Sequence, residues 1–224
     1  LHCWTKPQID MRFNYKPQRP LYLLAVRAYR LTQPQTVLNR SDALVDLHSG
    51  SWQFCVDYSF CHPGQDDFVN AFGSLATIHR PPIAGSSVGL MVGRGKPAVL
   101  AEFGGGLFED ERFVRKGVTG TLNCLKFLGM LPGKPVLERP PIVVDREHWF
   151  RPRHGGLLVA EITGHDLGQV IPRGTLLARI ISPYTFETLE ELRAPFARNL
   201  VVCVGSGMTR TQPGGHTYMV VELE

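Results

Sequence analysis

Two residues that can do chemistry stand at the ends of apolar, strand-like runs. His48 closes the run that starts at Ala43, and Glu102 lies near the end of the run Pro97–Phe103. Small residues follow both, and α/β enzymes present side chains in this way at the carboxyl ends of their strands. A neutral imidazole can bind zinc, and a nearby carboxylate can take a proton from water at the metal. His48 is therefore a candidate metal ligand and Glu102 a candidate general base.

Asp46 alternates with His48 along the same run, so the two side chains should project from one face of the strand. Asp46 could then hold the imidazole in position through a hydrogen bond. A backbone cap or a buried ion pair is the alternative role for Asp46. His48 and Glu102 also have structural alternatives, because a histidine after an apolar strand can simply be hydrogen-bonded and an acid there is often solvated or salt-bridged.

The motifs around these residues resemble the succinylglutamate desuccinylase and aspartoacylase family. The resemblance runs from about Asp42 to the end of the chain and depends on several motifs that occur in the family's order and spacing. The matching segments are Asp46–Gly50, Gly95–Val99 leading into Glu102–Gly105, and, in the C-terminal region, Gly155–Leu157, Leu167–Gly174 and Leu192–Pro195.

This resemblance implies a zinc-dependent hydrolase related to carboxypeptidases, which cleaves an amide or ester bond of a small N-acyl amino acid or similar compound. In that family one zinc ion is held by a His and a Glu of an H-x-x-E motif and by a second His on a later strand. His48 matches the later His. Glu102 matches the catalytic Glu that activates water at the metal and then protonates the leaving amine.

The chain departs from the family pattern at the other zinc ligands. None of its eight histidines is followed three positions later by Glu, so two of the three expected ligands are missing. The pair Asn39-Arg40 has the letters of the family's substrate-binding motif, but it lies too close to His48 and is interpreted as a coincidence in a loop. The expectation is a C-terminal portion of a longer protein. The alternative is a degenerate, metal-free relative that acts as a binding module.

The predicted fold class is α/β: a partial zinc-carboxypeptidase-like α/β/α sheet domain over 1–133, a linker over 134–153, and a small all-β barrel or sandwich over 154–224. Residues 134–153 are rich in Pro and Arg, which favours a linker. The expected elements are a helix over Leu21–Leu31, a strand over Asp42–His48, an irregular aromatic stretch over Ser49–Pro82, a short helix over Ser86–Arg94, a strand over Pro97–Phe103, a helix over Glu109–Leu128, and short strands at Ile142–Val144, 156–162, 175–181, 200–204 and 217–223.

Two of these regions allow more than one interpretation. The aromatic stretch either lines a pocket near the metal or is a loop packed by its own side chains. The C-terminal region also resembles the barrel-sandwich folds that carry biotin or lipoate, but no Lys follows Lys134, which excludes a covalent carrier. A non-catalytic sugar- or peptide-binding role stays open.

Composition argues against several other classes of protein. The net charge of +4 is scattered, so nucleic acid is not an expected partner, and no apolar run reaches the roughly 18 residues needed to span a bilayer. The five cysteines form no C-x-x-C pair, and no secretory pattern is present. Free thiols in a reducing cytoplasm are expected, with Cys124 in the core and a disulfide between Cys55 and Cys61 as the less favoured alternative. The expected partner is a small-molecule substrate; the sequence does not indicate an oligomeric state.

Overall fold

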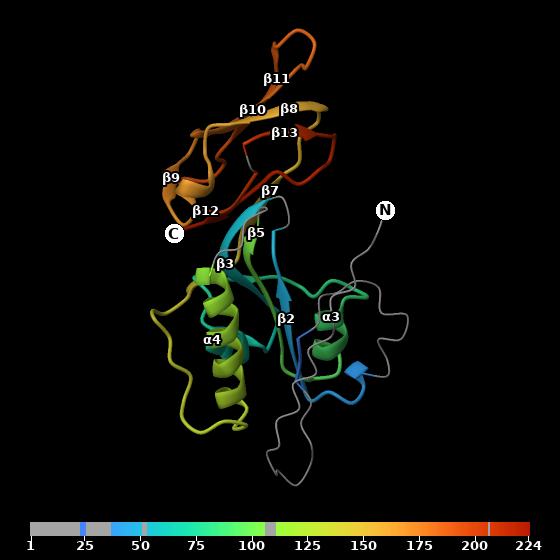
Figure 1. Ribbon diagram of the computed structural model, residues 1–224, viewed down its shortest axis with the longest axis vertical. Coiled ribbons are helices and arrows are strands. Elements are labelled where there is room, and N and C mark those ends of the chain that lie inside the picture. Colours follow the sequence, from blue (N-terminus) through green and yellow to red (C-terminus); the bar gives the residue numbers. More distant parts are fainter. Residues whose placement is uncertain (1–22, 26–36, 51–52, 106–110, 206) are drawn as a thin grey trace.

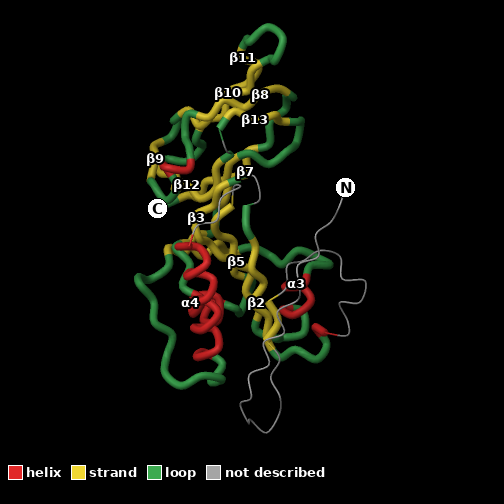
Figure 2. The backbone as a smooth tube through the Cα atoms, viewed as in Figure 1, coloured by secondary structure: helices red, strands yellow, loops and turns green. Residues whose placement is uncertain are grey.

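The computed structural model describes residues 23–25, 37–50, 53–105, 111–205 and 207–224. The described part of the chain forms one ten-stranded sheet, one four-stranded sheet and three α-helices (Figure 1). Apart from a short 3-10 helix, the helices gather around one end of the larger sheet, and the other end of the molecule consists of strands and loops (Figure 2). The molecule is therefore a mixed α/β protein, as the sequence predicts.

The elements follow one another along the chain with these bounds: β1 Leu23–Ala25, β2 Ala43–His48, β3 Phe54–Cys61, α2 Asp66–Phe72, β4 Ala76–His79, α3 Ser87–Val92, β5 Ala98–Gly105, α4 Glu111–Phe127, β6 Ile142–Val144, β7 Glu147–Phe150, β8 Gly156–Ala160, η1 Gly164–Asp166, β9 Val170–Pro172, β10 Leu176–Ile181, β11 Thr188–Arg193, β12 Arg198–Val204, β13 Met208–Thr211 and β14 Tyr218–Glu222.

The order of strands in the larger sheet is β1-β2-β5-β3-β12-β14-β7, with β4 beside β3, β6 beside β4 and β9 beside β12. Strands β1, β2 and β5 are parallel to one another. Strand β3 runs antiparallel to β5, and β4 and β6 are parallel to β3. The carboxyl ends of β2 and β5 therefore point to one edge of the sheet, and those of β3, β4 and β6 to the opposite edge.

Helices cover both faces of the parallel strands because side chains alternate along each strand. On one face, Val45 and Val99 pack with Phe68 of α2 and Cys124 of α4. On the other face, Leu44, Ala98 and Leu100 pack with Val88 and Met91 of α3. Figure 1 shows α4 and α3 on opposite sides of β2 and β5. This α/β/α layering confirms the predicted fold class for this part of the chain.

The four-stranded sheet has the order β11-β10-β8-β13 and packs against the far end of the larger sheet. Leu158, Leu177 and Ile180 from the smaller sheet share a core with Val201 of β12 and Val220 of β14. The larger sheet thus takes strands from both sides of the linker predicted over 134–153, since β12 pairs with β3. The domain boundaries and the closed barrel or sandwich stay predictions.

The predicted helix over Leu21–Leu31 is wrong at three of its residues. Residues Leu23–Ala25 form strand β1, which pairs in parallel with Ala43–Val45 of β2. The residues on either side of β1 lie outside the described part of the chain. The six apolar residues Leu21–Val26 suit a buried strand as well as a helix, and periodicity alone does not separate the two in so short a run.

The stretch Ser49–Pro82 is not the irregular segment that the sequence suggests, because it contains β3, α2 and β4. Tyr58 and Phe60 lie two positions apart on β3 and belong to a core formed by β3, β4, β6, β12 and β14 of the larger sheet. Phe68 and Phe72 lie on the buried side of α2. These four aromatic side chains lie in the protein interior, so a loop packed by its own side chains does not describe them.

The other predicted elements have counterparts close to the expected bounds. Helices α3 and α4 and strands β2, β5 and β6 are confirmed. Four strands of the C-terminal region match the expected ones, while β7, β9, β11 and β13 were not predicted. Cys124 is fully buried, as expected. Cys55 and Cys61 are both free thiols, and Cys55 lies beside Cys203, with 3.4 Å between the sulfurs.

The glycines at the end of β5 allow a close approach between two segments of backbone. Gly104 and Gly105 have positive φ angles of 70° and 123°. A Cβ atom on Gly105 would lie 2.0 Å from the carbonyl oxygen of Gln53. Gly105 therefore approaches the chain's own backbone. Gly106 lies outside the described residues.

We expect Gly105→Ala to destabilise the fold by more than the roughly 1–3 kcal/mol of an unfavourable backbone conformation, because it also forces Gln53 to move. The matched control is Gly95→Ala: Gly95 has a φ of 68°, but a Cβ there meets nothing within 4 Å. Urea unfolding of both variants gives the two losses in free energy. Equal losses would contradict the close approach at Gly105.

Candidate active site

His48 and Glu102 lie side by side at the carboxyl ends of neighbouring parallel strands. They are direct partners in the register between β2 and β5. His48 Nδ1 and Glu102 Oε1 are 3.2 Å apart, an ion-pair contact. The His48 side chain is 31% exposed and that of Glu102 18%, so both remain accessible to a small molecule. The structure therefore brings together the two residues that the sequence singles out.

Asp46 lies next to the imidazole of His48, on the same face of β2. Its Oδ1 atom is 3.2 Å from His48 Nε2, and its side chain is 1% exposed. The other carboxylate oxygen, Oδ2, accepts a 2.5 Å hydrogen bond from the Ser87 hydroxyl at the start of α3. Neither Asp46 Oδ1 nor His48 Nε2 has a well-aligned hydrogen-bond partner. Asp46 is thus held by α3 and placed to orient the imidazole ring.

Two carboxylates around one ring determine the charge of His48. Asp46, and after it Glu102, raise the pKa of His48 to about 10, against the opposing effect of burial. The ring is therefore protonated at neutral pH when nothing else is bound. A metal ion must displace this proton, because only a neutral imidazole nitrogen binds a metal.

Two further residues border this site that the sequence does not single out. Ser87 holds Asp46 in place through its hydroxyl group. The sequence gives only a weak indication of this role, because a serine near the start of a helix is usually a cap. The cap of α3 is Ser86, whose hydroxyl accepts a hydrogen bond from the Gly89 N–H. Tyr58 is the partner of Glu102 in the register between β3 and β5 and is buried. Burial, with the nearby Cys55 and the charge of Glu102, raises the pKa of Tyr58 well above its usual value.

The donors at this site fit one position of a zinc centre. His48 offers the ring nitrogen that faces Glu102, and Asp46 stands at the other nitrogen, an arrangement common for metal-binding histidines. Catalytic zinc sites normally use three protein ligands. In the described part of the chain, the group of three side chains whose ligand atoms could meet at one ion is Cys61, Asp66 and His79, which does not include His48.

Solved structures of several other proteins match most of this chain. A succinylglutamate desuccinylase from Silicibacter sp. TM1040 is 26% identical, with a TM-score of 0.69, over 85% of this chain and 61% of its own. The ectoine utilization protein EutE (DoeB) from Ruegeria pomeroyi is 23% identical with a TM-score of 0.71, over 85% of this chain and 63% of its own. A succinylglutamate desuccinylase/aspartoacylase from Rhodobacter sphaeroides is 21% identical with a TM-score of 0.70; the coverage there is 85% of this chain and 61% of its own.

This chain spans just over three fifths of the length of those three proteins. A family model, described as a domain of unknown function (DUF1802), matches residues 1–50. No curated protein matches the chain by sequence. None of the helices in the described residues combines the length and the apolar character that crossing a membrane requires.

Proposed function

We propose, from the succinylglutamate desuccinylase/aspartoacylase fold of this chain, that the whole protein is a zinc-dependent hydrolase. Its substrate is a small N-acyl amino acid or a related compound, of which it cleaves the amide or ester bond. The observation that carries this proposal is the registered pair His48 and Glu102 at the carboxyl ends of β2 and β5, with 3.2 Å between imidazole and carboxylate.

Glu102 is the proposed general base and general acid. Its carboxylate accepts a proton from the attacking water, and the water oxygen bonds to the carbonyl carbon of the substrate. The carbon–nitrogen bond then breaks, and Glu102 passes the proton to the leaving nitrogen. The products are a carboxylate and a free amine. Because its side chain is 18% exposed, Glu102 can reach both water and substrate without a rearrangement of β5.

His48 is proposed to hold zinc through the ring nitrogen that faces Glu102, with Asp46 as a positioning residue at the other nitrogen. When bound, zinc would polarise the carbonyl group and make water more acidic. A complete site of three protein ligands needs donors besides the described residues of this chain. The zinc ion, its full ligand set and the reaction therefore belong to the proposal for the whole protein.

The shortage of ligands favours a second candidate function. If the protein holds no metal at His48, the same end of the sheet can still bind an acyl amino acid, with protonated His48 facing the substrate carboxylate. In that case the protein is a binding module that shares its fold with the hydrolases.

An assay of the whole protein separates these two functions. We expect N-succinyl and N-acetyl amino acids to release free amine in the presence of zinc, and a chelator to abolish the release. Metal analysis and ligand binding by calorimetry accompany the assay. Binding of an acyl amino acid without metal and without turnover would overturn the hydrolase proposal in favour of the binding module.

Asp46→Asn tests the positioning role. The change keeps the shape of the side chain but removes the charge that faces His48 Nε2, so we expect zinc affinity to fall by roughly 10- to 100-fold. The matched control is Asp42→Asn, an exposed carboxylate just before the same strand, which should leave affinity unchanged. Competition with a zinc chelator measures both variants. Equal zinc affinity in Asp46→Asn and the parent would exclude Asp46 from this role.

A further inference from the structure

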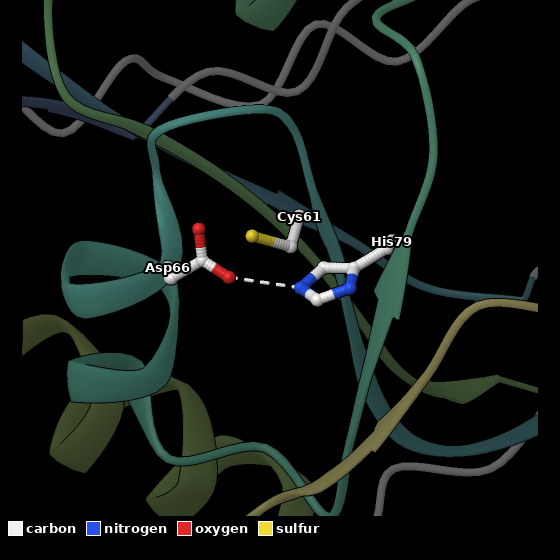
Figure 3. Close-up of side chains that lie close together, drawn as sticks. All are labelled: Cys61, Asp66 and His79. Atoms are coloured by element: carbon white, nitrogen blue, oxygen red, sulfur yellow. Dashed lines mark hydrogen bonds and ion pairs between the residues drawn. The ribbon is translucent and has the colours of Figure 1, made fainter.

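We propose that Cys61, Asp66 and His79, called here the Cys61 cluster, form a second metal site, suited to zinc and distinct from the His48 site. Figure 3 shows the three side chains pointing toward one another from β3, α2 and β4. One ligand atom from each residue lies within 4.8 Å of the others. Thiolate, imidazole and carboxylate together are a donor set that zinc accepts. This proposal does not depend on the hydrolase proposal.

The Cys61 cluster, like the His48 site, is built at the carboxyl ends of two neighbouring parallel strands. Cys61 and His79 are direct partners in the register between the parallel strands β3 and β4, and both stand at the carboxyl ends of those strands. Because β3 runs antiparallel to β5, this edge is opposite the one that carries His48 and Glu102. Cys61 packs on the α2 and α4 face, whereas Asp46 contacts Ser87 on the α3 face. The two sites are therefore separated by the sheet.

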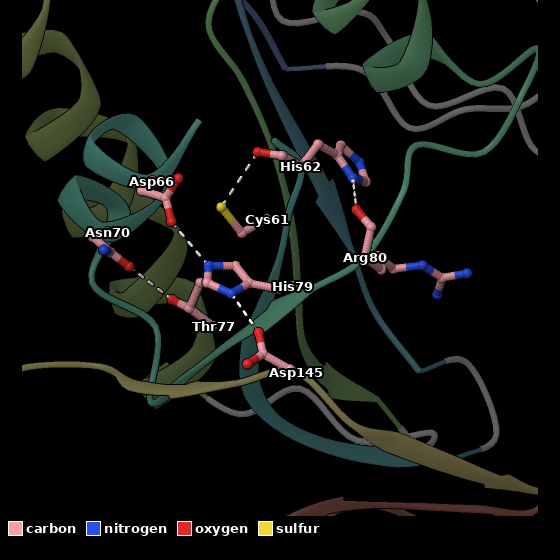
Figure 4. Close-up of polar contacts among 8 residues, drawn as sticks. All are labelled: Cys61, His62, Asp66, Asn70, Thr77, His79, Arg80 and Asp145. Atoms are coloured by element: carbon pink, nitrogen blue, oxygen red, sulfur yellow. Dashed lines mark hydrogen bonds and ion pairs between the residues drawn. The ribbon is translucent and has the colours of Figure 1, made fainter. Parts of the chain in front are cut away.

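A short, fixed loop brings Asp66 over Cys61. The loop between β3 and α2 turns at Gly64, which has a φ of 77°. His62 Nδ1 lies at hydrogen-bond distance, 2.9 Å, from the Arg80 carbonyl oxygen (Figure 4). The Ala98 N–H donates to the Gln65 side chain at 3.0 Å. These contacts hold the loop against β4 and β5, so the first turn of α2 is set in place before any ion binds.

His79 is oriented as metal-binding histidines usually are. Its Nδ1 atom is 2.7 Å from Asp145 Oδ1, and its Nε2 atom is 2.9 Å from Asp66 Oδ1. A carboxylate at one ring nitrogen fixes the tautomer and leaves the other nitrogen for the metal. Figure 4 shows Asp145 on one side of the ring, and Asp66 and Cys61 on the other. Asp145 is therefore the positioning residue, and Nε2 is the donor.

The charges around the cluster favour a cation. Asp66 and Asp145 both make their ion pairs with the ring of His79. The guanidinium group of Arg80 turns away: it pairs with Glu147 at 3.1 Å and lies over the Phe60 ring. A divalent ion would balance this excess of negative groups and hold the sulfur as a thiolate.

The cluster opens onto a cavity of about 240 Å³ lined by Cys61, His62, Pro63, Asp66, His79 and Arg80. This volume admits an ion together with a water molecule, since water occupies about 30 Å³ in the liquid. Three protein ligands and one water complete the tetrahedral coordination that zinc prefers. The cavity also provides the path by which the ion enters.

Cobalt(II) is the probe that separates the two sites, because a thiolate ligand gives a sulfur-to-cobalt charge-transfer band and the His48 site has no thiol ligand. We expect the whole protein carrying His48→Ala to bind one equivalent of cobalt with this band, and zinc to displace it. Adding Cys61→Ala should abolish the band. The matched control is Cys124→Ala, another buried free thiol, which should keep it.

Two variants at exposed residues test the proposal even if Cys61→Ala does not fold. Asp66 and Asp145 are 53% and 81% exposed, so Asp66→Asn and Asp145→Asn should fold normally. We expect Asp145→Asn to weaken cobalt affinity by about 10- to 100-fold while keeping the band. A missing band in the parent, a band that persists in folded Cys61→Ala, or unchanged affinity in both Asn variants would overturn the proposal and leave a hydrogen-bonded cluster that binds no metal.

Discussion

Replacing Glu102 with Gln in the whole protein is expected to lower kcat by on the order of 10²-fold or more, with little change in bound zinc. The amide has the shape of the carboxylate but cannot accept a proton from water or return one to the leaving nitrogen. It still fits beside His48, because the contact between Nδ1 and Oε1 is 3.2 Å long and lies at the partly exposed end of β5. Steady-state rates and metal analysis on one preparation measure both quantities.

The control for this result is Glu161→Gln, which removes a half-exposed carboxylate that pairs with Arg179 in the smaller sheet. We expect it to keep the parent kcat. If Glu102→Gln also kept the parent kcat, Glu102 would not be the base. If zinc were lost along with turnover, Glu102 would instead be a metal ligand, and the base would have to be sought elsewhere.

The second large effect is expected for His48→Ala, which should remove zinc from the proposed catalytic site and abolish turnover. No other described residue offers an imidazole beside Glu102, so the remaining carboxylates cannot replace the lost nitrogen donor. Zinc per protein chain is measured by elemental analysis after dialysis, with the Cys61 cluster disabled by Asp66→Asn so that only one site is counted.

His154→Ala is the matched control for His48→Ala. His154 also faces a carboxylate, with 3.1 Å between its Nδ1 and Glu190 Oε2, but it lies in the β-rich end of the molecule. The control should keep both zinc and turnover. Unchanged zinc content in His48→Ala would remove His48 from the metal site and favour the binding module.

The sequence could predict the core of the candidate active site because each residue ends a simple element. Strand β2 is a continuous apolar run up to Asp46 and His48, and β5 is another up to Glu102. Parallel neighbours with buried faces leave little freedom of register, so two such strand ends meet at the same edge of a sheet. The position of Asp46 follows from the alternation of side chains along β2.

Strand β3 could not be predicted in the same way, because the partners of its polar residues are distant in sequence. Ser59 is buried and shares a 2.7 Å hydrogen bond with Ser74. Asp57 accepts a hydrogen bond from the Leu75 N–H and pairs with Lys116 of α4 at 2.9 Å. Without those partners, the alternation of polar and aromatic residues indicates a surface loop as readily as a strand.

The Cys61 cluster was hidden for a related reason. No spacing within the sequence relates Cys61, Asp66, His79 and Asp145, and His79 alone gave no signal as a ligand. The cluster appears only once β3 and β4 pair in register and β6 carries Asp145 to the ring of His79. Local patterns do not predict that the ends of β3, β4 and β6 meet.

The pairing of β3 with β12 also determines when the protein can finish folding. Cys55 and Cys203 face each other across this pair although 148 positions separate them in the chain. During synthesis β3 emerges long before β12, so its first residues, Phe54 and Cys55, must wait for their partners while most of the chain is made. The rest of that side of β3 pairs with β4, which follows closely in the chain. Such distant contacts slow folding and leave a strand edge open to wrong pairing. Helices α2 and α4, which cover the neighbouring strands, can shield the growing sheet during this interval, whereas β12 and β14 join last.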